Sequence, residues 1–193
     1  MLTVILTGGA SRRMGRDKAL LPWNGGTLLQ SIVDRYAALG PVAVSVNEPG
    51  RFAFTGAREL VDSFPGLGPL NGIVSGFAET EAEELFLTAT DLPFGDPALA
   101  LRLAELRKET DADACVLRRG VKGVEPTFAV YGRGCLEPAR AALEQGKRAF
   151  FDLFERVDLR RVAPEELPGF PNLERILTNV NTQEEYERCL NQP

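Results

Sequence analysis

A run of apolar residues from Leu2 to Leu6, broken only by Thr3, opens the chain and ends at Thr7-Gly8-Gly9. A short apolar run followed by glycines is typical of a buried strand that leads into a turn. Further short apolar runs follow, and they alternate with longer segments that carry helix-start signals. Strands that alternate with helices predict an α/β sandwich around a mostly parallel sheet.

The same signals give the boundaries of the expected elements. We expect strands at residues 2–6, 41–46, 59–61, 85–89, 112–117 and 127–131, with weaker candidates at 157–162 and 175–178. We expect helices at residues 27–39, 72–79, 96–108 and 135–145, and a terminal helix from residue 182. Capping boxes support the first and last helices, and Asp96 followed by Pro97 supports the third. No repeat or linker divides the chain, so we expect residues 1–193 to form one domain.

Polar or glycine residues stand at the ends of four expected strands. They are Thr7-Gly8-Gly9, Asn47, Asp62 and Asp91. In open parallel sheets, ligands bind outside the carboxyl ends of the strands. We therefore expect these four positions to converge on one side of the sheet.

Composition narrows the classes of function. The chain is 44% hydrophobic and 25% charged, which is ordinary for a soluble globular protein. A net charge of −5 argues against non-specific nucleic-acid binding, and no stretch approaches the ~18 apolar residues of a membrane span. We therefore expect no nucleic-acid or membrane partner and a cytoplasmic location. The chain has no histidine, which excludes histidine-based triads, bases and metal sites, and its three separated cysteines form no paired metal motif.

The turn after the first expected strand is rich in glycines and cations. Gly8, Gly9 and Gly15 allow the backbone to approach a ligand closely, and the cations suit a triphosphate. The cations are Arg12, Arg13, Arg16 and Lys18. Because the turn matches neither GxxxxGK[ST] nor GxGxxG, it is neither a Walker P-loop nor a dinucleotide fingerprint. A solvated basic turn is the alternative to a phosphate-binding loop.

Asp91 is a candidate Mg²⁺ ligand because it follows a strand and precedes Pro93. Mg²⁺ is commonly held by one or two carboxylates together with substrate phosphates and water. Asp96 is the better helix cap, which leaves Asp91 for the metal, although a cap or turn aspartate is the alternative. Asp62 is either a ligand-binding carboxylate or a turn residue. Gly68 lies in a glycine-rich turn before a helix whose N-terminus suits an anion or a base edge.

Near the end of the chain, Asn179 and Asn181 flank Val180 and project to one side if this segment is extended. In the structural alternative, Asn181 simply belongs to the loop before the terminal helix. Glu125 is a weaker candidate for lining an acceptor pocket. Trp23 is expected to pack in the core rather than to bind a ligand.

The opening turn resembles the signature of the molybdenum cofactor guanylyltransferase (MobA) family, which runs roughly L-A-G-G-x-S-x-R-M-G-x-D-K. The chain matches it from Leu6 to Lys18 except for Thr7 in place of alanine. Further family-like segments follow in order over nearly the whole chain: VNEP (46–49), D-x-x-P-G-x-G-P-L-x-G (62–72), TDLPF (90–94), EPTFAVY (125–131) and NVNT (179–182). The opening motif marks the superfamily strongly, and the later segments point less sharply to the guanylyl branch.

This resemblance implies a Rossmann-like, three-layer nucleotidyltransferase fold and a role for each matching residue. The implied nucleotide-binding residues are Leu6, Thr7, Gly8, Gly9, Lys18, Asn47, Asp62, Gly68 and Asp91. Among them, Asn47 and Asp62 are expected to hold the base or ribose. Lys18 and Arg13 are the expected catalytic cations on the phosphates, and Asp91 is the expected catalytic ligand of Mg²⁺. Asn179 and Asn181 are expected near the acceptor.

The resemblance also implies Mg²⁺-dependent transfer of GMP from GTP to the molybdopterin form of molybdenum cofactor, with release of pyrophosphate. Proteins that deliver the pterin and receive the product are implied as partners. The alternatives are a cytidylyltransferase for the same pterin, another small nucleotidyltransferase such as a sugar-1-phosphate enzyme, and a non-catalytic nucleotide-binding module. The short chain counts against the sugar enzymes, and intact Lys18 and Asp91 count against the module.

Overall fold

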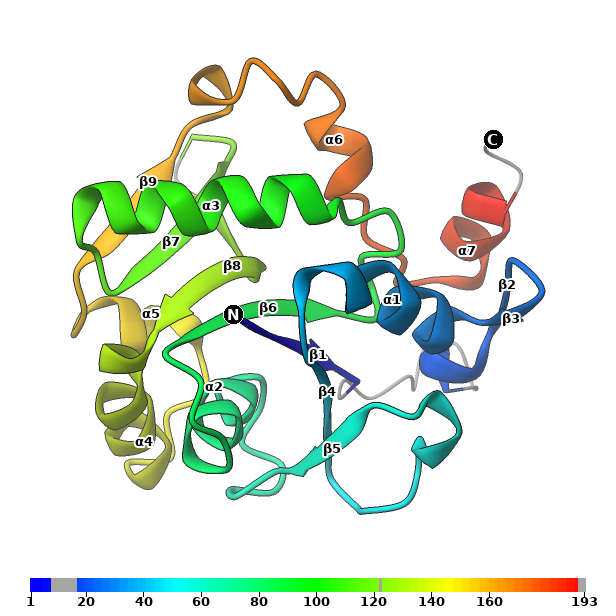
Figure 1. Cartoon of the computed structure of the whole chain (residues 1–193), viewed down its shortest axis with the longest axis horizontal. Coiled ribbons are helices and arrows are strands. Elements are labelled where there is room, and N and C mark those ends of the chain that lie inside the picture. The colour runs from blue at the N-terminus through cyan, green and yellow to red at the C-terminus, as the bar shows by residue number, and fades with distance from the viewer. Residues whose placement is uncertain (8–16, 122, 191–193) are drawn as a thin grey trace.

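The computed structural model describes residues 1–7, 17–121 and 123–190, and its centre is a seven-stranded sheet (Figure 1). The strand order is β5-β4-β1-β6-β8-β7-β9. The strands are β1 (Leu2–Leu6), β4 (Val42–Val46), β5 (Arg58–Val61), β6 (Glu84–Ala89), β7 (Ala114–Arg119), β8 (Gly123–Gly132) and β9 (Leu159–Val162). Of these seven, only β8 runs antiparallel to its neighbours, so the predicted mostly parallel sheet is confirmed.

Helices cover both faces of this sheet and complete three layers (Figure 1). On one face are α1 (Leu28–Tyr36), α3 (Pro97–Thr110), α6 (Leu173–Ile176) and α7 (Gln183–Leu190). On the other are α2 (Leu70–Ala78), α4 (Leu136–Glu144) and α5 (Phe150–Phe154). Strand side chains alternate between the two cores: Ile5 packs with the first set, whereas Val4 and Leu6 pack with the second. The sandwich therefore follows from strands that are apolar on both faces.

Local capping signals define the first and last helices. Thr27 Oγ1 accepts from Gln30 N at 3.1 Å where α1 begins. The Gln30 side chain donates to Asp34 rather than back to the cap, so only half of the predicted capping box forms. At α7, Thr182 and Glu185 cap each other in both directions, with bonds of 3.0 and 3.2 Å.

The predicted strand at residues 175–178 is wrong. This segment contains the end of α6 and a turn in which Leu177 N donates to Leu173 O. Ile176 and Leu177 are both buried, and adjacent side chains enter one core more readily from a helical turn than from a strand, where they alternate.

Several short elements carry no clear sequence signal. They are α5, the hairpin of β2 (Pro22–Trp23) and β3 (Gly26–Thr27), and 3₁₀ turns at Lys18–Leu20, Ala37–Leu39, Ala53–Thr55, Arg133–Cys135 and Pro164–Glu166. The β2–β3 hairpin matters because it directly follows Lys18. It packs against α7 through Trp23, which is 5% exposed and lies against the rings of Phe94 and Tyr186. The Tyr186 hydroxyl donates to Pro22 O, so the C-terminal helix fixes the segment after Lys18.

All three cysteines are buried and free. Across the described ranges, no helix has the length and apolar character needed to cross a bilayer.

Candidate active site

Parallel pairing of β1, β4, β5 and β6 brings their carboxyl ends to one edge of the sheet. Thr7, Asn47 and Asp62 directly follow β1, β4 and β5, and Asp91 follows β6 after one residue. The predicted convergence of these four positions is therefore found in the fold. Gly8, Gly9 and Arg13, the remaining predicted residues of the opening turn, lie outside the described residues.

A chain of hydrogen bonds joins three strand ends on one side of this edge. Thr7 Oγ1 donates to Ser45 O at 2.6 Å, and Ser45 Oγ donates to Asp62 Oδ1 at 2.7 Å. Burial raises the pKa of the Asp62 carboxyl, and the bond from Ser45 partly opposes that rise. Asn47 is exposed at the end of β4, whereas Leu6 is buried and holds Thr90 N through its carbonyl at 3.1 Å. Asp62 is thus fixed by its neighbours and half-buried.

The loop after Asp62 is held by one buried asparagine. Asn71 Oδ1 accepts from Phe64 N at 2.9 Å, and Asn71 Nδ2 donates to the carbonyls of Phe64 and Gly68 at 2.8 and 3.2 Å. Gly68 itself has φ +86°, a left-handed conformation that favours glycine. The glycine predicted for binding therefore also has a structural reason to be there, and it lies exposed just before α2.

Asp91, Lys18 and Asn181 form the second part of the edge. Lys18 Nζ donates to Asn181 Oδ1 at 3.3 Å, and Val180 N donates to Asp91 O at 2.8 Å. Burial lowers the pKa of Lys18, while the negative charges of Asp91 and Glu185 oppose that shift. Residues separated by 163 positions in the chain are thus brought into direct contact.

The Asp91 side chain has one oxygen, Oδ1, that is buried and has no hydrogen-bond partner within the described part of the chain. Burial raises the pKa of this carboxyl. The positive charge of Lys18 opposes the rise, the negative charge of Glu125 adds to it, and the positive charge of Arg119 opposes it more weakly. A buried carboxylate oxygen left without a donor is costly unless a cation or ligand group completes it. Asp91 therefore fits a hard cation such as Mg²⁺, which is commonly held by one or two carboxylates plus substrate oxygens. In the described ranges, no three Cys, Asp or Glu side chains gather into a metal cage.

The two asparagines of the C-terminal segment differ in their contacts. Asn181 turns its side-chain oxygen to Lys18, while its backbone N donates to Glu185 Oε2 at 2.6 Å beside the cap of α7. Asn181 therefore lies in the loop before α7, as the structural alternative predicts, and its side chain also contacts Lys18 in the candidate site. The Asn179 side chain makes a local bond to Leu177 O at 3.5 Å and is half-buried.

Two charged residues that the sequence analysis supports weakly or does not name, Glu125 and Arg119, lie at this edge of the sheet. Glu125 is only 6% exposed, and its Oε2 accepts from Arg119 Nη1 at 2.8 Å. Sequence reasoning gives Glu125 weak support and does not single out Arg119. The available signal was Arg119 itself, a cation at the end of an apolar run, but only the strand pairing shows which edge it occupies.

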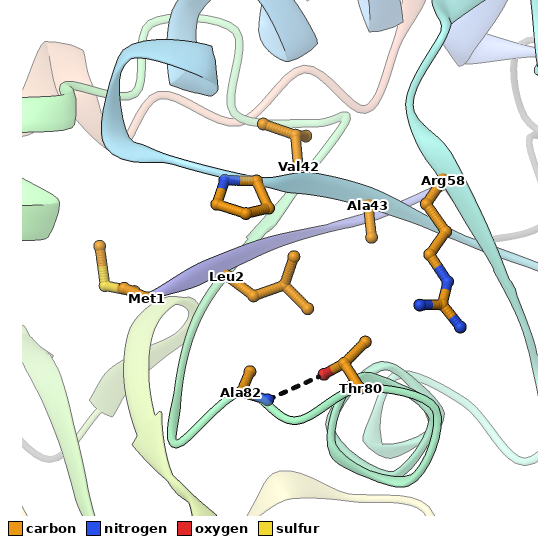
Figure 2. A pocket seen from close by; sticks show the side chains of 8 residues that line it. Met1, Leu2, Val42, Ala43, Arg58, Thr80 and Ala82 are labelled. Atoms are coloured by element: carbon orange, nitrogen blue, oxygen red, sulfur yellow. Dashed lines mark hydrogen bonds between the residues drawn. The ribbon is translucent and has the colours of Figure 1, made fainter.

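A cavity of about 330 Å³ lies at the opposite edge of the sheet (Figure 2). It is lined by Met1, Leu2, Pro41, Val42, Ala43, Arg58, Thr80 and Ala82, which stand at or near the amino ends of β1, β4, β5 and β6. Its charged lining residue, Arg58, is bound to Glu79 through the carbonyl at 2.8 Å and the carboxylate at 3.7 Å. The cavity is therefore separate from the residues that gather at the carboxyl ends.

Replacing Asn181 with alanine should slow group transfer roughly 10-fold while GTP affinity changes little, because the variant loses one hydrogen bond that orients Lys18. The backbone bond from residue 181 to Glu185 does not need the side chain, so the melting temperature should hold. Steady-state kinetics, calorimetric GTP binding and thermal melting measure these three quantities. Loss of GTP binding together with a lowered melting temperature would show that the side chain is structural.

A family model for the MobA-like NTP transferase domain matches residues 3–161. Among curated relatives, a protein of Carboxydothermus hydrogenoformans named "Probable molybdenum cofactor guanylyltransferase" is 33% identical over 98% of this chain and 95% of its own length. A Methanosarcina mazei protein of the same name is 30% identical over 97% of this chain and 88% of its own.

Solved structures share the fold at low sequence identity. Molybdopterin-guanine dinucleotide biosynthesis protein A of Archaeoglobus fulgidus superposes with a TM-score of 0.87 at 22% identity, covering 98% of this chain and 97% of its own. The 2-C-methyl-D-erythritol 4-phosphate cytidylyltransferase of Thermus thermophilus superposes with a TM-score of 0.68 at 16% identity, covering 95% of each chain. The same fold thus occurs in an enzyme named for cytidylyl transfer, so the fold does not determine the base.

Proposed function

The chain belongs to the MobA-like NTP transferase family, and from this premise we propose that it transfers GMP from GTP to the molybdopterin form of molybdenum cofactor. The products are the guanine dinucleotide form of the cofactor and pyrophosphate. Relatives at 30–33% identity over nearly the full chain carry the guanylyltransferase name, which supports this substrate pair.

The observation that carries the proposal is the buried Oδ1 of Asp91, which lies beside Lys18 and Asn181 and has no hydrogen-bond partner among residues 1–7, 17–121 and 123–190. A carboxylate in this state suits a metal, and the neighbouring ammonium suits phosphate oxygens. Mg²⁺ bound at Asp91 would supply positive charge against the triphosphate and the leaving pyrophosphate.

In the proposed reaction, a phosphate oxygen of the acceptor attacks the α-phosphorus of GTP. The new O–P bond forms as the bond from the α-phosphorus to the bridging oxygen breaks, and pyrophosphate leaves with that electron pair. An acceptor phosphate is already ionised near pH 7, so the step requires no general base, which suits a chain without histidine. Lys18 contributes charge on the phosphates, and Asn181 orients Lys18.

At the other end of the site, we assign Asp62 to the base. The guanine edge presents N1–H and N2–H₂ donors side by side, and a fixed carboxylate accepts from both. Adenine and cytosine present no such pair, so each unmade bond would cost about 1–3 kcal/mol, or roughly 5–150-fold in affinity. The bond from Ser45 Oγ to Asp62 Oδ1 fixes the carboxylate for this contact.

Competition binding of GTP, CTP and ATP tests this assignment, with Asp62→Ala compared against wild type. We expect wild type to prefer GTP and the variant to lose that preference. Asp34→Ala, which removes an exposed carboxylate of α1, is the matched control and should bind all three as wild type does. Equal loss of all three nucleotides would assign Asp62 to the ribose. A wild-type preference for CTP would favour the cytidylyl alternative and contradict the proposed nucleotide.

A further inference from the structure

A second cationic side chain, Arg119, lies along the same edge of the sheet as Lys18 and Asp91. β6 is antiparallel to β8, and β8 is antiparallel to β7, so β7 runs in the same direction as β6. Arg119 is the last residue of β7 and therefore lies at the edge where Asp91 follows β6. Two strand spacings separate β6 from β7, which is about 10 Å.

Glu125 holds Arg119 in place from the neighbouring strand. Its Oε2 accepts from Arg119 Nη1 at 2.8 Å, and its Oε1 accepts from Thr127 N and Oγ1 at 3.2 and 2.6 Å. Both carboxylate oxygens of Glu125 thus accept hydrogen bonds, whereas Asp91 Oδ1 accepts none from the residues that the structure describes. The side chain of Glu125 is 9% exposed and that of Arg119 is 43% exposed. The buried acid is therefore an anchor, and the guanidinium it holds still faces solvent.

A β-bulge aims this pair toward the site. The register of β7 against β8 shifts between Val116 and Leu117, after which Leu117 pairs with Glu125. Leu117 packs in the same core cluster as Leu92 and Val180, which neighbour Asp91 and Asn181. Arg119 and Leu117 share a face because they are two residues apart on one strand. The guanidinium thus lies on the face of the sheet that is covered by the cluster of Leu92 and Val180, the sequence neighbours of Asp91 and Asn181.

We propose that Arg119 binds an anionic phosphate group of the acceptor and that Glu125 is the positioning residue that presents it. This rests on the proposed function. An arginine with one nitrogen fixed by a carboxylate retains further donors in a planar fork, the geometry that suits phosphate oxygens.

The strand order supports the acceptor over the nucleotide as the ligand of Arg119. Ser45 lies on β4, and Thr7 and Asp62 directly follow β1 and β5, all on one side of β6, whereas Arg119 lies on β7 on the other side. About 14 Å separates β1 from β7. A nucleotide that extends from Asp62 to Lys18 therefore reaches Asp91 from one side and leaves the Arg119 side for the attacking phosphate.

The test compares Arg119→Ala, Arg119→Lys and Glu125→Gln with wild type, with the molybdopterin form of molybdenum cofactor as acceptor. We expect Arg119→Ala to raise the acceptor KM roughly 10–100-fold with kcat and GTP affinity near wild type. The acceptor KM of Arg119→Lys should lie between those of wild type and Arg119→Ala, because lysine keeps the charge and lacks the planar fork of donors. Glu125→Gln should raise the acceptor KM less than Arg119→Ala, since the cation remains but loses its charged anchor.

Arg118→Ala is the matched control. Arg118 is also exposed on β7, but it pairs with Val124, which packs in the opposite core cluster, so its side chain belongs to the other face. It should leave the acceptor KM unchanged. Equilibrium binding of the acceptor without GTP gives a readout that does not depend on turnover.

Unchanged acceptor binding in Arg119→Ala, with wild type turning over, would overturn this inference and leave the proposed function intact. Loss of GTP affinity equal to the loss of acceptor affinity would overturn it as well, because Arg119 would then belong to the nucleotide. A wild type that binds no acceptor and releases no pyrophosphate would overturn the proposed function, and this inference with it.

Discussion

Asp91→Asn should lower kcat by at least 10²–10³-fold, roughly the cost of removing one preorganised electrostatic group in other enzymes. The substitution keeps the shape of the side chain and removes the charge that suits Mg²⁺. The backbone bond from Val180 N to Asp91 O is independent of the side chain, so the fold should persist. Burial raises the pKa of Asp91, which means that the charge of this carboxyl is less favourable in the folded state than in the unfolded chain. The melting temperature should therefore stay the same or rise, as at sites where function opposes stability.

Asp96→Asn is the matched control for this prediction. Asp96 caps α3 by accepting from Ala98 N at 2.8 Å, and asparagine caps helices about as well as aspartate does. Both its activity and its melting temperature should match those of wild type. Titration of kcat against Mg²⁺ measures the effect at Asp91. Near-normal turnover of Asp91→Asn at low Mg²⁺ would remove this residue from the reaction.

Lys18→Ala should weaken GTP binding and slow transfer together, each roughly 10–100-fold, because it removes a charge-assisted contact to phosphate. Lys18 follows the glycine turn and contacts Asn181, so its charge lies beside Asp91 rather than in a solvated face. Loss of both binding and rate distinguishes Lys18 from Asn181, whose replacement should affect rate alone.

Arg161→Ala provides the comparison for Lys18. Arg161 is exposed on β9, and its loss should change neither GTP affinity nor kcat. Calorimetry and initial rates on both variants measure the contrast. If the two variants behaved alike, the result would contradict phosphate binding by Lys18 and support the alternative, in which the opening turn is a solvated basic segment.

The sequence predicts the strand ends of this fold well because apolar runs and capping residues act locally. Leu2–Leu6 forms β1 with the predicted bounds, and Thr182 with Glu185 starts α7 as expected. Parallel pairing then follows from alternation, and with it the gathering of Asp62 and Asp91 at one edge. These parts of the site can be predicted from the sequence because each residue lies at or next to the end of a strand.

Contacts between segments that are distant in the chain cannot be predicted from local sequence patterns in this way. The bond from Lys18 to Asn181 depends on α7 packing against the hairpin of β2 and β3, which no local pattern predicts. The anchor of Arg119 depends on a bulge in β8, where residues 126–128 lie between the Val116–Ala129 and Leu117–Glu125 pairs, and the apolar pattern of that segment does not reveal it. The strand predicted at 175–178 is wrong for a related reason, since a short apolar run fits a buried helical turn as well as a strand.

Pyrophosphate release from GTP, measured with and without the molybdopterin form of molybdenum cofactor, tests the central claim most directly. With Mg²⁺ present, the wild type should release one pyrophosphate for each guanine dinucleotide product detected by mass spectrometry, and release should require the acceptor. A chain that binds GTP and releases no pyrophosphate with the acceptor present would contradict the account and support a nucleotide-binding module instead.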